Sequence, residues 1–435
     1  MGKSFVFLQK INVPQAAFFF CCLIVAGMLT TNFFRILSSI GNAGLLLTAL
    51  VSLAQQNNVS NLRKYPYFLG FIIIYLVHLL GFMQPEISSM KDLQRDLVMK
   101  LPLLILPFAF AVLPAISRPK LNQLFYLFVV CVFLGSVYST GYYLNNFEAV
   151  NEQYIHSQVM KTPTNHVRYS LMVAFAVLVG YRLWLKGFFV FGDWERKLLL
   201  FITVWLFVFL HILAVRSGLV AFYAVAALGL AFDFFFRRQY LRSFVAGIGL
   251  LLALLAAFYT LPTFYNKFFL TIADVNRVSD EDSAHDYSIT GRVYSYKVAM
   301  AVFEENPVIG VGIGNLDKEL GEKYTRLFPE ILERGHLLPH NQYLFDLVAF
   351  GIVGLLIFLI GFYYPLFRFA GRFEPLFLFH YLIITLSCMF ESTLETQVGL
   401  MYSILFILLP LWYFKANPAQ KETWQNGTFF APKSL

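Results

Sequence analysis

Long apolar runs are the feature that most restricts how this chain can fold. A helix that crosses a membrane needs about 20 consecutive, mostly apolar residues, and the sequence contains roughly twelve such segments. They lie near residues 14–31, 34–53, 65–82, 98–115, 121–143, 167–186, 197–215, 218–236, 243–261, 341–363, 375–393 and 397–414. Charged residues make up only 13% of the chain, about half the share found in soluble domains. The sequence therefore predicts an all-α, polytopic transmembrane helical bundle of about twelve spans.

Basic residues between the apolar segments predict the orientation of the chain. Short cytoplasmic loops of membrane proteins are enriched in lysine and arginine. With the N-terminus inside, the cytoplasmic turns would hold Arg63, Lys64, Arg118, Lys120, Lys186, Arg196, Lys197, Arg237, Arg238, Arg242, Arg368 and Arg372. Both termini are thus expected in the cytoplasm and residues 262–340 outside. Because the net charge of +8 comes from these clusters, it does not indicate nucleic-acid binding.

This pattern divides the chain into four parts. Residues 1–261 hold spans one to nine, residues 262–340 form a large external loop between spans nine and ten, residues 341–415 hold spans ten to twelve, and residues 416–435 form a polar, disordered tail. A connection of about eighty residues is too long to be idle in a compact fold. Its first part, from Asp274 to Asp286, is polar and is expected to be mobile.

Two amphipathic helices are predicted within the long loop. The first has Val293, Tyr296, Met300 and Phe303 on one face and ends before Pro307. The second has Leu316, Leu320, Tyr324, Leu327 and Ile331 on one face and is broken at Pro329. The glycines at 310, 312 and 314 lie between them and indicate a tight turn, since they lack the flanking residues of a nucleotide-binding loop. Together these helices would cap the outer mouth of the bundle or lie on the membrane interface.

Three residues could carry chemistry at the outer surface. His340 stands at the start of span ten, and an imidazole titrates near working pH, so it suits proton abstraction; a boundary residue bonded to the helix end is the alternative. Arg216 interrupts an apolar sequence between spans seven and eight, where a charge is costly and points to function. Arg292 opens the first loop helix, against the helix dipole, and is either an anion ligand or a solvated surface residue.

Further polar residues are expected at the same side of the membrane. His166 and Arg168 begin span six, and Glu391 and Glu395 lie near the outer end of span eleven. Buried carboxylates and arginines tend to pair, so these four residues are expected to position substrate or to form a pairing network. No metal site is predicted, because the cysteines lie inside apolar runs and the acidic stretch 280–282 is typical of a solvated loop.

Three motifs together resemble a known family. They are Arg216-Ser217-Gly218 at the outer end of a span, Thr290-Gly291-Arg292 followed by Asn306–Gly312, and His340-Asn341 followed by Gly351 and Gly354. In this combination the chain resembles the O-antigen ligase-like membrane glycosyltransferases, which include O-antigen ligases, O-antigen and exopolysaccharide polymerases, and protein O-oligosaccharyltransferases. The twelve-span layout with one large late loop is similar as well, so the resemblance covers most of the chain.

The resemblance implies transfer of a glycan from undecaprenyl diphosphate to a sugar hydroxyl of lipid A-core, at the periplasmic face of the bacterial inner membrane. No cofactor and no metal would be needed. Arg216 and Arg292 would hold the diphosphate, His340 would activate the acceptor hydroxyl, and Asn341 would join the polar ring in binding substrate. A polymerase that uses a lipid-linked repeat unit as acceptor stays open as the alternative.

A polysaccharide-lipid transporter is the alternative from a different class. Transporters usually contain internal repeats and broken helices that meet at the middle of the membrane. This sequence has no visible repeat, and its polar residues gather at the outer edge. The pattern therefore favours an enzyme.

Overall fold

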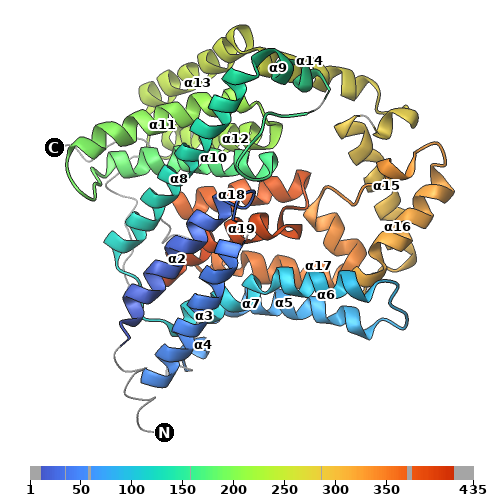
Figure 1. The fold of residues 1–435 in the computed structure, drawn as a ribbon, viewed down its shortest axis with the longest axis horizontal. Coiled ribbons are helices and arrows are strands. Elements are labelled where there is room, and N and C mark those ends of the chain that lie inside the picture. The colour runs from blue at the N-terminus through green and yellow to red at the C-terminus, as the bar shows by residue number, and fades with distance from the viewer. Residues whose placement is uncertain are drawn as a thin grey trace.

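The structure is a computed structural model that describes residues 11–34, 36–56, 60–156, 158–285, 287–369 and 375–415. Within these ranges every regular element is helical (Figure 1). Nine segments there are long and apolar enough to cross a membrane: α3 (Ile36–Gln56), Pro66–Met83 with α5 (Leu69–His78) at its centre, α8 (Arg118–Asn145), α10 (His166–Leu185), α11 (Trp194–Leu213), α12 (Arg216–Phe235), α13 (Tyr240–Thr260), α17 (Gln342–Arg368) and α19 (Gln397–Phe414). The all-α, multi-pass prediction is confirmed.

Three of the twelve predicted spans correspond to shorter helices. Two of these are apolar, α2 (Val13–Leu29) and α18 (Pro375–Phe390). In place of the fourth span are α6 (Met90–Lys100), which is polar, and α7 (Pro102–Val112), which is apolar. With 11 residues, α7 is only about 16 Å long, roughly half a bilayer core. The number twelve therefore stays a prediction.

The C-terminal helix α19 occupies the centre of the bundle. It is almost completely buried and packs against α2, α7, α8, α10 and α18, and Figure 1 shows it in the middle of the molecule. By contrast, α13 lies at the edge and exposes apolar side chains along most of its length. An exposed apolar helix is suited to contact with lipid, which agrees with a membrane protein.

The long loop is mostly helical. It contains α14 (Pro262–Asn276), α15 (Ser288–Glu305) and α16 (Ile313–Leu327), and Figure 1 shows α15 and α16 together on one side of the molecule. The expectation of a mobile polar segment is wrong at its first residue, because Asp274 ends the last turn of α14 and is completely buried. Asp286, Arg372 and the predicted tail at 416–435 lie outside the described residues.

Only one of the two predicted amphipathic faces is confirmed. In α16 the predicted residues Leu316, Leu320 and Tyr324 are buried, whereas Leu327, the last residue of the helix, is exposed. In α15 the buried face is offset by one or two positions and contains Tyr294, Val298 and Val302, whereas the predicted residues Val293, Tyr296, Met300 and Phe303 are half-buried or exposed. The reason is that Arg292 and Tyr296 turn toward the polar site described below, so the helix face that they share is only partly buried.

The glycine-rich segment between α15 and α16 is built against a break in α17. Gly351 interrupts that helix with φ +65° and ψ −169°, so nearby backbone groups lose their helical partners. The segment from Pro307 to Gly312 replaces those partners with backbone hydrogen bonds in both directions: Val311 N–H to Val348 O (3.0 Å), Gly312 N–H to Ala349 O (2.8 Å), Ile352 N–H to Pro307 O (2.9 Å) and Val353 N–H to Val308 O (3.3 Å). Irregular backbone in a membrane helix is tolerated only when it is satisfied in this way.

Candidate active site

Five helix ends that are far apart in the sequence meet at one end of the bundle. They are the starts of α10, α12, α15 and α17 and the turn that follows α18. Three of the four starts have a local cause: Asn165 and Asn341 cap α10 and α17 with their side chains, and Asp274 accepts hydrogen bonds from the first amides of α15. The eight predicted site residues all lie at these ends.

Glu391, in the turn after α18, gathers three of the predicted residues. Its Oε1 pairs with Arg292 from α15, and its Oε2 lies 3.2 Å from Nδ1 of His340 and 3.5 Å from Nη1 of Arg168 in α10. The Arg168 guanidinium also donates to the carbonyl of Ser392 at 3.1 Å. Of the four residues predicted to pair, Arg168 and Glu391 do so, and Glu391 also contacts Arg292 and His340.

The ionisation of Glu391 decides which nitrogen of His340 is available. Burial would raise the pKa of this carboxyl, but the hydrogen bond from His340 and the charges of Arg292, His340 and Arg168 outweigh burial and lower it. An ionised carboxylate can only accept hydrogen bonds, so Nδ1 of His340 is the donor. In the neutral imidazole Nε2 then carries the lone pair, and it has no hydrogen bond with the described residues. His340 is thus arranged to accept a proton at Nε2.

Arg216 lies in a second ion pair beside the first. Its Nη2 is 3.8 Å from Oδ2 of Asp274, whose carboxylate also accepts from the amides of Ile289 (2.8 Å) and Thr290 (3.0 Å). These amides belong to the first turn of α15, and Arg292 lies on the same helix. Asp274 therefore connects Arg216 at the start of α12 to the end of α15 that carries Arg292. Arg216 and Arg292 are close enough to repel each other.

Exposure separates this cluster into a floor and an open face. The side chains of His340, Arg216 and Arg292 are 34%, 29% and 27% exposed, whereas those of Glu391, Arg168 and Asp274 are 4%, 8% and 0% exposed. The three residues predicted to be catalytic are therefore those that a substrate can reach. The buried carboxylates beneath hold them in place.

The other predicted residues have less direct positions. His166 is within electrostatic reach of Glu391 and Arg168. The Asn341 amide donates to Met389 O at 3.1 Å while its oxygen caps α17. Glu395 lies in a neighbouring network, where its Oε1 accepts from Lys100 at 2.5 Å and from Gln342 at 2.8 Å. Substrate binding by these three residues stays a prediction.

Two charged residues of the site were not singled out by sequence. Asp274 has no spacing that links it to Thr290, so nothing in the pattern identified it. Lys267 in α14 is a lone charge among aromatic residues, the signal that identified Arg216. It is buried, and it lies within electrostatic reach of Arg216, Asp274 and Arg292. Desolvation by burial, followed by the charges of the two arginines, lowers its pKa to about 8 despite the opposing effect of Asp274.

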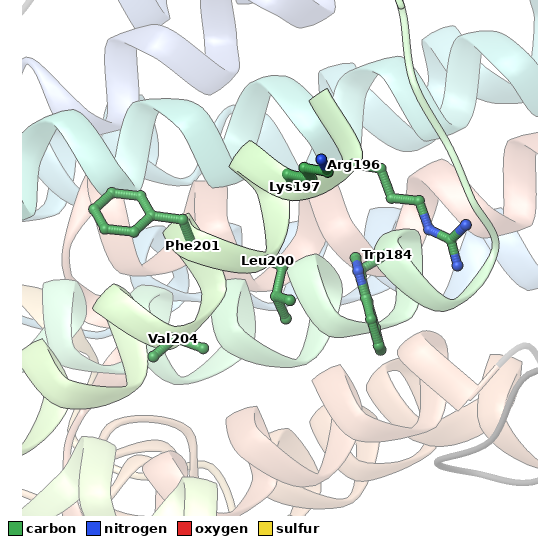
Figure 2. Close-up of a pocket in the computed structure, with 6 residues that line it drawn as sticks. All are labelled: Trp184, Arg196, Lys197, Leu200, Phe201 and Val204. Atoms are coloured by element: carbon green, nitrogen blue, oxygen red, sulfur yellow. The ribbon is translucent and has the colours of Figure 1, made fainter. Parts of the chain in front are cut away.

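A cavity of about 550 Å³ lies elsewhere in the molecule, between α10 and α11. Figure 2 shows its lining residues, Trp184, Arg196, Lys197, Leu200, Phe201 and Val204. Arg196 and Lys197 belong to the first turn of α11, whereas Arg216 follows the other end of that helix, about 30 Å away by its length. This cavity is therefore separate from the polar cluster.

The fold and the cluster together define a multi-pass membrane protein with a histidine–carboxylate pair and several cations at one end of its bundle. Comparison with protein families adds a closer assignment for part of the chain: residues 201–359 match the O-antigen ligase family model, which supports an O-antigen ligase-like family. The matched region contains Arg216, Lys267, Asp274, Arg292 and His340, while Arg168 and Glu391 lie outside it. No curated protein matches the chain.

Proposed function

We propose that this protein transfers an O-antigen-type glycan from undecaprenyl diphosphate to a sugar hydroxyl of lipid A-core, as a lipopolysaccharide O-antigen ligase. The family supports a membrane glycosyltransferase of the ligase or polymerase type. The proposal rests on one observation. At one end of the helix bundle, His340 has a free Nε2 and lies in the same cluster as two accessible arginines, Arg216 and Arg292. We further propose that this end faces the periplasm and that both termini are cytoplasmic, in line with the basic residues in the opposite turns.

The arginines suit the donor half of the reaction. A guanidinium can bind phosphate oxygens with two parallel hydrogen bonds, and Arg216 and Arg292 present partly exposed guanidiniums next to each other. During transfer, the bond between the anomeric carbon and the diphosphate oxygen breaks, and the electron pair leaves with undecaprenyl diphosphate. Fixed cations lower the energy of that developing charge.

His340 suits the acceptor half. As the acceptor oxygen bonds to the anomeric carbon, its proton passes to Nε2 of His340, and the imidazolium that forms is stabilised by Glu391 at 3.2 Å. General-base assistance of this kind contributes about 10²- to 10⁴-fold in rate. Attack opposite the leaving diphosphate inverts the configuration of the anomeric carbon.

The experiment replaces the gene with the His340→Ala form in a Gram-negative host that assembles O antigen through this protein, and resolves its surface polysaccharide on a gel. Bare core with accumulated long lipid-linked chains is expected for a ligase. Core that carries a single repeat unit would instead assign the protein as a polymerase. His156→Ala is the matched control, because His156 is an exposed histidine that follows α9 (Phe147–Ile155). An unchanged ladder with the His340 variant present in the membrane would overturn the catalytic role of the histidine.

A further inference from the structure

The Lys267 ammonium is the one charge of the described cluster that the protein leaves uncompensated. Its side chain is 9% exposed, and its Nζ makes no hydrogen bond or ion pair with the residues that the structure describes. Desolvation of a charged group without a direct partner is unfavourable. Such a group persists where something else that binds there supplies the missing charge.

Asp274 does not supply it. Its carboxylate already accepts hydrogen bonds from the amides of Ile289 and Thr290 and from the Thr290 hydroxyl, and it pairs with Arg216. Lys267 is about two helical turns further back on α14 than Asp274, and its nearest charges also include Arg292. Lys267 is therefore a third cation beside Arg216 and Arg292, and the carboxylate of Asp274, which lies among them, already has its hydrogen-bond partners.

The charges of the whole cluster point the same way. Four cationic side chains, Arg168, Arg216, Lys267 and Arg292, share two carboxylates, Asp274 and Glu391. The excess positive charge lies on the side of Arg216 and Arg292, whose guanidiniums are partly exposed. A ligand that carries two neighbouring phosphoryl groups matches this excess in both charge and extent.

We propose that Lys267 is a third cationic ligand of the donor diphosphate, beside Arg216 and Arg292, an inference that rests on the proposed function. Its ammonium binds a phosphoryl oxygen when the donor enters and helps to stabilise the charge on the leaving diphosphate. No covalent step passes through it.

The proposal has a pH signature. The groups that face Lys267 are Arg216 from α12, Asp274 from its own helix, Arg292 from α15 and His166 from α10. Its pKa of about 8 means that the ammonium is charged below pH 8 and loses its proton as the pH rises through that value. An arginine at the same position would stay charged throughout.

Binding of farnesyl diphosphate to the detergent-purified full-length protein, measured by titration calorimetry at pH 7 and pH 9, tests the proposal. At pH 7, Lys267→Met is expected to weaken binding roughly 10- to 100-fold, and Lys267→Arg to stay close to the parent. At pH 9, the parent should weaken relative to Lys267→Arg, by up to about tenfold. The protonation of the ligand itself cancels, because every variant is titrated with the same ligand at the same pH.

The controls separate the two proposals. Lys318→Met removes an exposed lysine of α16 and should bind like the parent. If Arg216→Ala weakens binding and Lys267→Met does not, only the role of Lys267 is overturned. If the parent does not bind farnesyl diphosphate, the diphosphate site and the role of Lys267 fail together. Should Lys267→Met not fold, equal pH dependence of the parent and Lys267→Arg would still overturn the proposal.

Discussion

Two glutamates in the turn between α18 and α19 have opposite surroundings, although they are only four positions apart. Glu391 contacts Arg292 and His340, whose side chains are accessible. Glu395 contacts Lys100 and Gln342, which are both buried. We name the first set the open network (Arg168, Arg216, Asp274, Arg292, His340 and Glu391) and the second the closed network (Lys100, Gln342, Asp346 and Glu395).

The difference separates two uses of charge inside one membrane protein. In the closed network Lys100 also donates to Leu394 O at 2.9 Å, and Gln342 bonds Asp346, Glu395 and the Leu394 amide. These bonds join α6, α17 and the turn, and they fix the turn that carries Glu391. The open network contains the accessible side chains to which we assign the chemistry, and the closed network is a buried set of bonds that holds the turn in place.

The largest effect is expected from His340→Ala in the open network. Loss of the general base should lower the turnover of purified protein by about 10²- to 10⁴-fold, with little change in thermal stability because His340 is partly exposed and at a helix start. The measurement is release of undecaprenyl diphosphate from a lipid-linked glycan in the presence of acceptor. Turnover within threefold of the parent would place the chemistry outside the open network.

Glu395→Gln should produce the opposite pattern. It removes the ion-pair partner of Lys100, whose side chain is only 2% exposed, and breaking a buried pair costs roughly 3–5 kcal/mol. We expect a large loss of thermal stability in detergent, with nearly normal turnover by the protein that stays folded. The double variant Lys100→Met with Glu395→Gln should recover much of the stability. If Glu395→Gln is stable but inactive, the closed network takes part in catalysis and the distinction is wrong.

Gly351→Ala should disturb both networks at once. A Cβ there would lie 2.2 Å from Val308 O, and the backbone has a φ of +65°, so the break in α17 and its bonds to the glycine-rich segment must shift. Backbone strain of this kind costs on the order of 1–3 kcal/mol before the clash is counted. Folded protein recovered from membranes and turnover should both fall. Gly321→Ala in α16 is the control, since its Cβ meets nothing within 4 Å and should stabilise the helix slightly.

The sequence predicted the helices and the polar residues better than it predicted their partners. Lone charges in apolar surroundings identified Arg216 directly, and positive charges at alternate turns placed His166, Arg292, His340 and Glu391 on one side. The pairs themselves span 99 positions between Arg292 and Glu391 and 51 between His340 and Glu391. Contacts of that range follow from the packing of whole helices, which local periodicity does not encode.

The same limit explains the two structural errors. The apolar periodicity of α15 cannot distinguish a face that packs in the core from one beside a polar site. Tyr296 falls on the predicted apolar face, but its hydroxyl donates to His340 O at 2.7 Å. The sequence predicts Asp274 as the start of a polar, mobile segment, because its role depends on amides 15 and 16 positions later. Only the tertiary position of α14 against α15 makes that role visible.

The smallest effect is expected from Asn341→Ala, and it tests a residue that stands between the two networks. Asn341 follows His340 in the open network and precedes Gln342 in the closed one, and its side chain caps α17 at Leu344 N (3.0 Å) and donates to Met389 O (3.1 Å). Loss of an N-cap costs about 1 kcal/mol, so thermal stability should fall modestly while the KM for acceptor stays unchanged. Asn341→Asp keeps the capping oxygen and should restore most of the stability. A raised acceptor KM with unaltered stability would instead show that the amide binds substrate and extends the open network by one residue along α17.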